Sequence, residues 1–384
     1  MTRYLLLLTA AIAVIGANSL VLSPIAASVA MSFTDVDAAE VMTAAAAYGL
    51  FTALSALLLA PRADRIGAER ALVRALWILT VALAGTGMAP ALWTLVVVQT
   101  LAGVAAGMAL PAIYTLTAQV ADKGRESEAL GMVLTGWTIS LVVGVGLSAV
   151  LADLLHWRAV FSLLAVVACL LALVIARLRG WGSQVHDMAP STPLHALQVR
   201  GLSTALVNVA AYMMAFYGLY TYLGPHIGET LERSTAFAGL TIAAYGAGFG
   251  VAAPLGRLVD RYGMVPAACV SFAALAMVYL GLAVAAEHPL VLLILCAIWG
   301  VANHMGLNLL VRRLTELDPA QRGAIMGLYS ATTYLCVFAG ALLYRPILNH
   351  AGFATCALVS ALFILPALVW ALSNRRPASR LRQG

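Results

Sequence analysis

Charge is scarce in this 384-residue sequence, in which Asp, Glu, Lys and Arg together make up 10% of the residues. Soluble domains have about 25% charged and 45–50% apolar residues, whereas 62% of this sequence is hydrophobic. A water-soluble chain of this length could not bury that much apolar surface, which excludes a large soluble enzyme. Basic residues form no run except a short C-terminal tail, which argues against disorder and nucleic-acid binding. An integral membrane protein with many spans remains.

Signatures of catalysis and cofactor binding are also missing. The five cysteines lie in apolar runs without a C-x-x-C pair, so we expect neither disulfides nor a metal site. The sequence has no G-x-x-x-x-G-K-[ST] motif, which argues against transport driven by ATP. No Ser–His–Asp set or carboxylate pair falls into one plausible pocket, so the sequence predicts no enzyme and no cofactor.

The apolar runs are continuous, about 20 residues long and without a period of two, which predicts membrane-spanning helices rather than strands. We expect twelve spans and an all-α integral membrane fold. The expected spans are Tyr4–Met31, Ala38–Ala60, Ala71–Pro90, Ala91–Val120, Ser127–Leu151, Trp157–Ala176, Gly201–Leu223, Ser234–Gly256, Met264–Ala286, Pro289–Val311, Gly323–Leu343 and Ala351–Leu372.

Basic residues predict how the chain sits in the membrane. With the N-terminus inside, 19 of the 22 Lys and Arg residues fall in inside segments, and only Arg158, Arg233 and Arg345 fall outside. Loops rich in Lys and Arg stay on the cytoplasmic side, so both termini are expected there, in a bacterial inner membrane. The net charge of +6 therefore records topology and does not indicate an anionic partner.

The two halves of the sequence resemble each other. Residues 63–67 match residues 259–263 at an offset of 196, and residues 103–108 match residues 300–305 at an offset of 197. Such repeats predict two six-helix bundles related by a pseudo-two-fold axis along the membrane normal. The expected domains are a bundle over residues 1–176, a cytoplasmic linker over 177–200, and a second bundle with a basic tail over 201–384.

One repeated loop carries a family resemblance. Residues 256–263, Gly-Arg-Leu-Val-Asp-Arg-Tyr-Gly, resemble the G-x-L-x-D-R-x-G signature of the major facilitator superfamily, and residues 60–67 are a copy without the first glycine. Residues 144–148 resemble the glycine-rich exporter motif of span five, without its Gly-Pro pair. The whole layout is similar to bacterial sugar and drug efflux permeases of the arabinose-efflux type. The resemblance implies a two-bundle transporter with a cavity lined by spans one, four, seven and ten.

The resemblance also implies a cytoplasmic gate. In the family, the loop aspartate pairs with an arginine and stabilises the outward-facing state, while glycine permits a tight turn with positive φ. The alternative is a set of solvated loop charges. The expected gate residues are Asp64, Arg65, Gly67, Gly256, Asp260, Arg261 and Gly263.

His304 is the one titratable side chain expected deep in a span, because no Asp or Glu lies there. Its repeat counterpart is Gly107, so packing symmetry does not require a histidine at this position. Ionisable groups inside membranes suggest function, and histidine titrates near neutral pH, so His304 is our candidate for proton coupling. The alternative is a neutral histidine that bonds two helices together.

The remaining candidates are polar and uncharged. Gln99 and Asn18 occupy positions where many proton-coupled exporters of the resembled family have an arginine and an aspartate. Mid-span tyrosines are expected in the cavity, whereas those near helix ends are more often interface anchors. The expected substrate-binding residues are Asn18, Tyr48, Gln99, Tyr114, Trp137, Asn208, Tyr212, Tyr245, Asn303, His304, Asn308 and Tyr329.

A pathway without buried charge favours a neutral or zwitterionic solute, such as a sugar, a nucleoside or an amphipathic drug. We therefore predict a secondary active exporter that works by alternating access and is coupled to protons. The alternatives are an uncoupled facilitator or a proton symporter for uptake and, more remotely, a non-transporting membrane sensor. The expected partners are the small solute, the lipid bilayer and protons, with no nucleic acid, and the expected oligomeric state is a monomer.

Overall fold

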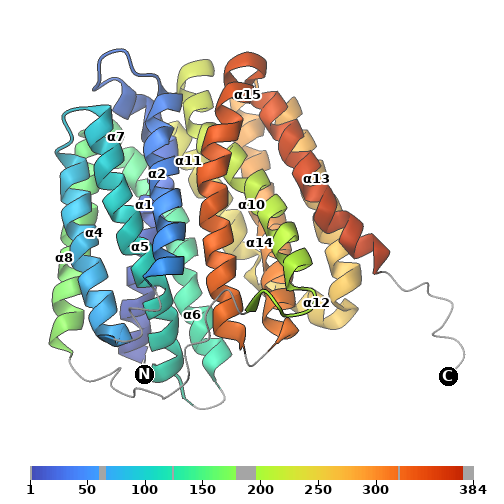
Figure 1. Cartoon of the computed structure of the whole chain (residues 1–384). Coiled ribbons are helices and arrows are strands. Elements are labelled where there is room, and N and C mark those ends of the chain that lie inside the picture. The colour runs from blue at the N-terminus through green and yellow to red at the C-terminus, as the bar shows by residue number, and fades with distance from the viewer. Residues whose placement is uncertain (1, 60–65, 123–124, 179–195, 319–320, 375–384) are drawn as a thin grey trace, which may run out of the picture.

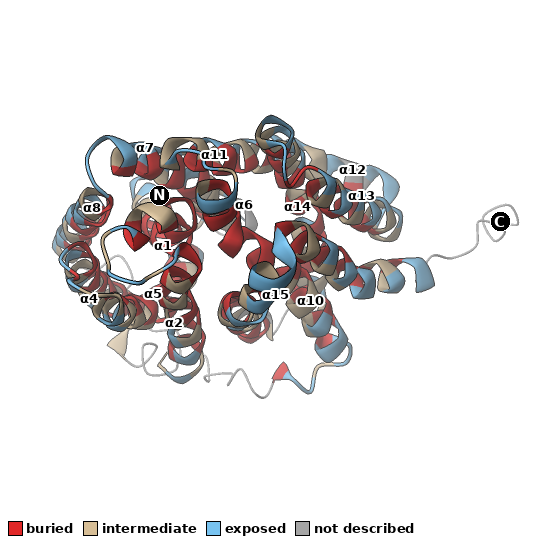
Figure 2. Cartoon of the chain, turned by 90° about the horizontal axis from the view of Figure 1, so that it is seen from above, coloured by how far each residue is buried: buried red, intermediate tan, exposed pale blue. Residues whose placement is uncertain are grey.

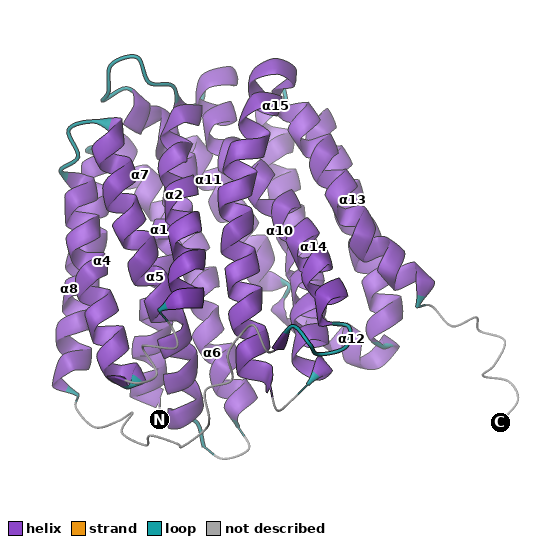
Figure 3. Ribbon diagram, viewed as in Figure 1, coloured by secondary structure: helices purple, strands orange, loops and turns teal. Residues whose placement is uncertain are grey.

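The chain forms long helices packed side by side along one common direction (Figures 1 and 3). The structure is a computed structural model and describes residues 2–59, 66–122, 125–178, 196–318 and 321–374. Within these ranges there is no strand. Helices pair each backbone N–H and C=O within one segment, as a hydrocarbon environment requires. The all-helical class expected from the sequence is confirmed.

The helices before residue 179 include one span with an interruption. This span consists of α6, a π-helical segment η1 and α7, and η1 lies in the glycine-containing stretch Ser140–Val145. The helices are α1 (Thr2–Ala30), α2 (Ala38–Leu58), α4 (Ala68–Gly87), α5 (Leu92–Val120), α6 (Glu126–Ile139), α7 (Gly146–Leu154) and α8 (Trp157–Arg177).

The helices after residue 195 begin with α10, which continues directly into the π-helical turn η2 (His226–Thr230). A short 3₁₀ turn, η3 (Ala253–Leu255), joins α11 to α12. The helices are α10 (Leu202–Pro225), α11 (Thr235–Val251), α12 (Gly256–Tyr262), α13 (Met264–Val284), α14 (Pro289–Leu317) and α15 (Arg322–Ser373).

The described residues contain 11 helical segments long and apolar enough to cross a membrane. The last one, α15, has a non-helical backbone at Gly352 (φ 75°, ψ 175°) and is two helices joined at that residue. Figure 1 shows it rising to the upper end in orange and returning in red. The expected count of twelve is therefore met approximately, by eleven segments of which one folds back on itself.

Several expected span ends are wrong, among them that of the tenth span, which was expected to stop at Val311 although α14 continues to Leu317. The eleventh span was expected to stop at Leu343, but its helix continues to the bend at Gly352. The seventh was expected to stop at Leu223, but α10 continues through Pro225 into η2. The apolar pattern ends at the first polar residues, whereas helical hydrogen bonding continues beyond them.

Burial agrees with a membrane environment. Exposed residues lie around the perimeter of the helices and buried residues lie between them (Figure 2). Many exposed side chains are large and apolar, such as Val284, which is 83% exposed. Such a surface is unfavourable in water and favourable against lipid.

The sequence repeat reappears as a repeated helix crossing. Gly103 of α5 packs against the carbonyl oxygen of Tyr48 in α2, and Gly300 of α14 packs in the same way against the carbonyl oxygen of Tyr245 in α11. A Cβ atom at either glycine would collide with that backbone. Both crossings therefore need glycine for their close approach.

Helices from the two halves of the sequence (residues 1–176, the first half, and residues 201–384, the second half) also contact each other. The most extensive contacts join α1 with α10, α2 with α15, and η1 and α7 with α11. The α2–α15 contact is close, because a Cβ atom at Gly49 would lie 2.7 Å from the Val337 side chain. We call the end of the molecule at the top of Figure 1, where α2 begins, the upper end.

Candidate substrate-binding and coupling site

Tyrosines from both halves meet between α2, α5, α10 and α15. Their phenol groups lie near one another. Across the halves, the rings of Tyr48 and Tyr334 make an edge contact with centroids 6.1 Å apart. The Trp137 indole of α6 lies beside the Tyr114 hydroxyl. We call this group the central tyrosine cluster; its members are Tyr48, Tyr114, Tyr217, Tyr329 and Tyr334.

Three members of this cluster, Tyr48, Tyr114 and Tyr329, were named from the sequence as candidates. Tyr217 and Tyr334 were not named as candidates. Tyr334 lies five positions after Tyr329 in one apolar helix, a spacing that places the two on different faces of an ideal helix. No sequence pattern could therefore have grouped them.

Asn303 is the centre of a buried network in the second half. Its side-chain amide donates a hydrogen bond of 2.6 Å to the Tyr245 hydroxyl, and its backbone carbonyl accepts one from the Tyr212 hydroxyl. The Tyr245 ring stacks on Phe216 at 5.5 Å and lies 4.8 Å from the Trp299 ring. The candidates Tyr212, Tyr245 and Asn303 are thus brought together from α10, α11 and α14, inside an aromatic core.

His304 follows Asn303 but faces α11. Its ring lies edge-on to Phe249, with centroids 4.6 Å apart. It is half-buried, and its Nδ1 atom is buried with no hydrogen-bond partner in the described part of the chain. At the equivalent crossing in the first half, Gly107 packs on the Thr52 carbonyl. Where the first half has a glycine packed on a backbone carbonyl, the second half therefore has a histidine whose Nδ1 atom is free to form a hydrogen bond.

Asn208 and Asn308 lie in different surroundings. Asn208 in α10 is 3% exposed, and its side-chain nitrogen has no partner among the described residues. Asn308 is exposed, one turn beyond His304, on the side of α14 that faces the start of α12. Asn208 thus has an unused buried donor, whereas Asn308 can be satisfied by water.

Asn18 and Gln99 bind each other. Two reciprocal amide hydrogen bonds of 3.2 Å join them, and the Gln99 nitrogen also donates to the Thr86 hydroxyl at 3.3 Å. Both residues are almost completely buried, at 2% and 0% exposure. The pair ties α1 to α5 and α4 and carries no charge. It can bind a solute only if it opens.

The gate loops are partly described. Asp64 and Arg65 lie outside the described residues, and so does the side chain of Asp260. Gly67 and Gly263 both have φ of 87°, a conformation open to glycine, each directly before the following helix.

The remaining gate candidates show no such requirement. Gly256 has helical backbone angles (φ −52°), so its backbone does not need glycine. The Arg261 guanidinium lies 5.4 Å from the Tyr262 ring. The expected pairing of aspartate with arginine in these loops stays a prediction.

Comparison with known proteins relates this architecture to a family. The family model described as Major Facilitator Superfamily matches residues 6–341 and, in a second match, residues 205–384. The human organic anion transporter MFSD10 (TETRAN) has a crystal structure that covers 96% of this chain and 99% of its own, with a TM-score of 0.77 at 15% identity. That likeness concerns the fold.

Curated relatives agree with this match. The "Uncharacterized MFS-type transporter YwfA" of Bacillus subtilis is 25% identical over 385 residues, covering 98% of this chain and 93% of that protein. A "Probable sugar efflux transporter" of Pasteurella multocida is 26% identical over 263 residues, covering 66% of this chain and 63% of that protein. This multi-pass membrane protein belongs to the Major Facilitator Superfamily of transporters, which are not enzymes.

Proposed function

We propose that the chain is a secondary active exporter of a small neutral or zwitterionic solute. The central tyrosine cluster carries this proposal, because it joins both halves and contains only uncharged phenols. A charged solute would lose its hydration there without gaining an opposite charge. A solute with hydroxyl or amide groups and a flat face can hydrogen-bond to phenols and stack on their rings. A sugar, a nucleoside or an amphipathic drug has this chemistry.

Transport proceeds by alternating access, in which residues 1–176 and 201–384 rock about the site between them. The repeated crossings at Gly103 and Gly300 support two equivalent halves. The loops with Gly67 and Gly263 form the cytoplasmic gate together with their acidic and basic residues. Export is favoured over uptake because one relative is named for sugar efflux.

His304 is the proposed proton carrier. Its Nδ1 atom is buried and lacks a partner, so a proton gained there is not blocked by an existing bond. The neutral pair of Asn18 and Gln99 favours a second candidate, an uncoupled facilitator, because the first half has no charge at that position.

The membrane and orientation follow from the charge distribution. We place the chain as a monomer in the bacterial inner membrane with both termini in the cytoplasm, so that the upper end faces outward. The three basic residues expected outside are Arg158, Arg233 and Arg345, and all three lie near the upper ends of helices.

Transport by purified protein in liposomes tests the proposal. Wild-type protein should move a neutral solute without ATP and accumulate it against its gradient when a pH gradient is imposed. His304→Ala should keep solute exchange but lose about 90% of the pH-driven accumulation, because His304 is the one side chain expected deep in a span that titrates near neutral pH.

His350→Gln is the matched control, since His350 is exposed near the bend of α15, and it should behave as wild type. Exchange by wild-type protein with no response to a pH gradient would favour the facilitator instead. A strict need for ATP would exclude both candidates.

A further inference from the structure

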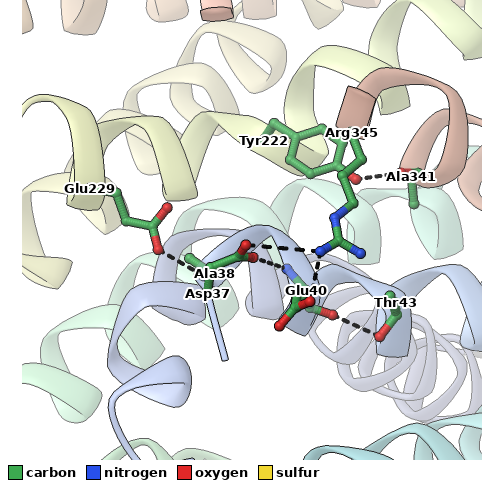
Figure 4. A network of polar contacts seen from close by, with 8 residues as sticks. All are labelled: Asp37, Ala38, Glu40, Thr43, Tyr222, Glu229, Ala341 and Arg345. Atoms are coloured by element: carbon green, nitrogen blue, oxygen red, sulfur yellow. Dashed lines mark hydrogen bonds and ion pairs between the residues drawn. The ribbon is translucent and has the colours of Figure 1, made fainter. Parts of the chain in front are cut away.

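Contacts between the two halves gather where α2 begins, at the upper end (Figure 4). Asp37 precedes α2 and caps it, because its carboxylate accepts a hydrogen bond of 2.5 Å from the Glu40 backbone nitrogen. Glu40 lies in the first turn of the helix. The first half thus presents two carboxylates toward the second half.

Arg345 of α15 faces these carboxylates. One guanidinium nitrogen lies 2.9 Å from a Glu40 carboxylate oxygen and 3.9 Å from a carboxylate oxygen of Asp37. The Arg345 and Glu40 side chains are 30% and 35% exposed, so water screens this pair only in part. The two partners lie 305 positions apart in the sequence. The ion pair between Arg345 and Glu40 therefore joins the two halves and is not a contact within a single helix.

Glu229 of η2 makes a second charged contact with the same helix end. Its carboxylate accepts a hydrogen bond of 2.7 Å from the Ala38 backbone nitrogen. Ala38 is the first residue of α2, where backbone N–H groups lack helical partners and the helix dipole is positive. A carboxylate is stabilised at this position. The second half therefore contacts the start of α2 with both a cation and an anion.

The second half holds these two residues in place. His226, the first residue of the turn that contains Glu229, is buried with its ring stacked on Phe353 at 4.4 Å. Its Nε2 atom lies 2.7 Å from the Ala286 carbonyl oxygen. The Tyr222 hydroxyl donates to the Ala341 carbonyl, one turn before Arg345. Glu229 and Arg345 are thus supported by α10, α15 and the residues directly after α13.

A neutral contact accompanies the charged one. Pro24 in α1 has no backbone N–H, so the Leu20 carbonyl lacks its usual helical donor. The Tyr220 hydroxyl of α10 donates to that carbonyl at 3.1 Å. Beside it, the Ser23 hydroxyl donates to the Tyr220 carbonyl at 2.7 Å. The upper ends of α1 and α10 are therefore joined through the Leu20 and Tyr220 carbonyls, which in a regular helix would accept hydrogen bonds from their own backbone.

We infer that Asp37, Glu40, Glu229 and Arg345 form an upper latch that holds the outer side of the transporter closed. Separating the halves at this end exposes the positive end of α2 and breaks the Arg345–Glu40 bond. The latch thereby sets the ratio of the two access states. It rests on the proposed alternating access, and its test does not need the substrate.

Amide hydrogen exchange of the full chain in lipid nanodiscs tests the latch. Glu40→Arg and Arg345→Glu each place like charges together, and each should raise exchange in residues 34–48 by about three- to tenfold. The double variant, with both charges exchanged, restores the opposite-charge pair but leaves a carboxylate at position 345 beside Asp37. Its exchange should therefore fall clearly below that of either single variant without fully returning to wild type. Arg345→Gln, which removes the charge without reversing it, should give a smaller rise in the same residues.

Arg233→Glu is the matched control, because it makes the same charge change at an exposed position of the same end, outside the latch. It should leave exchange in residues 34–48 unchanged. Thermal unfolding of every variant shows whether it is folded, and Arg345→Gln serves if a reversed variant is not.

Unchanged exchange in both the reversal and Arg345→Gln variants would overturn the latch, and so would a double variant that exchanges as fast as the single ones. These outcomes are separate from transport. Altered exchange in a protein that moves no solute would uphold the latch and reject the proposed function. Normal transport with unaltered exchange would overturn the latch and leave the proposed function standing.

Discussion

At the scale of residues, the hydrogen bonds between Asn18 and Gln99 predict that loss of either amide lowers the stability of the protein. Gln99→Ala leaves the Asn18 amide buried without its partner. An orphaned buried polar group costs about 1–3 kcal/mol, so the variant should unfold at a lower temperature in detergent. The double variant Asn18→Ala with Gln99→Ala should lose less than the sum of the two single losses. Additive losses would mean that the two amides do not depend on each other.

The same pair illustrates what the sequence could not predict. The residue types and their depth in the membrane were evident, and both were expected to face a solute. Their mutual hydrogen bonds depend on how α1 and α5 are rotated about their axes, which hydropathy does not encode because these spans are apolar on most sides. The ion pair of Arg345 with Glu40 was not predicted either, because Arg345 was expected on the outer side, where charges are normally solvated.

At the scale of elements, the turn between α12 and α13 makes a second prediction. Gly263 combines φ 87° with ψ 157°, a region almost restricted to glycine, and a Cβ there would meet only the Pro266 ring at 3.9 Å, an ordinary contact distance. Gly263→Ala should therefore destabilise the protein by about 1–3 kcal/mol through backbone strain alone. Gly256→Ala, at a helical φ of −52°, is the control and should be neutral or stabilising. Thermal unfolding of both compares them, and equal melting temperatures would contradict the strain.

Helices and turns could be predicted from the sequence where nearby residues alone determine them. Apolar runs located the spans, and repeated Asp-Arg-x-Gly stretches located turns in which Gly67 and Gly263 share one conformation. The π-helical segment Ser140–Val145 was not foreseen, because the glycines in and directly after it pack against other helices, Gly144 on Ala17 and Gly146 on Ala243. Interruptions of this kind arise from tertiary packing, which a single apolar run does not reveal.

At the scale of the whole molecule, the uneven distribution of basic residues predicts one orientation. Because 19 of 22 lie in segments assigned to the cytoplasm, a protease-sensitive tag after Gly384 should be cleaved in inside-out vesicles and protected in right-side-out ones. A tag inserted at Leu155, an exposed residue between α7 and α8, is the control and should show the opposite pattern. Cleavage of the C-terminal tag in right-side-out vesicles would mean that the protein has the opposite orientation in the membrane. The latch of Asp37, Glu40, Glu229 and Arg345 would then close the cytoplasmic side instead of the outer side.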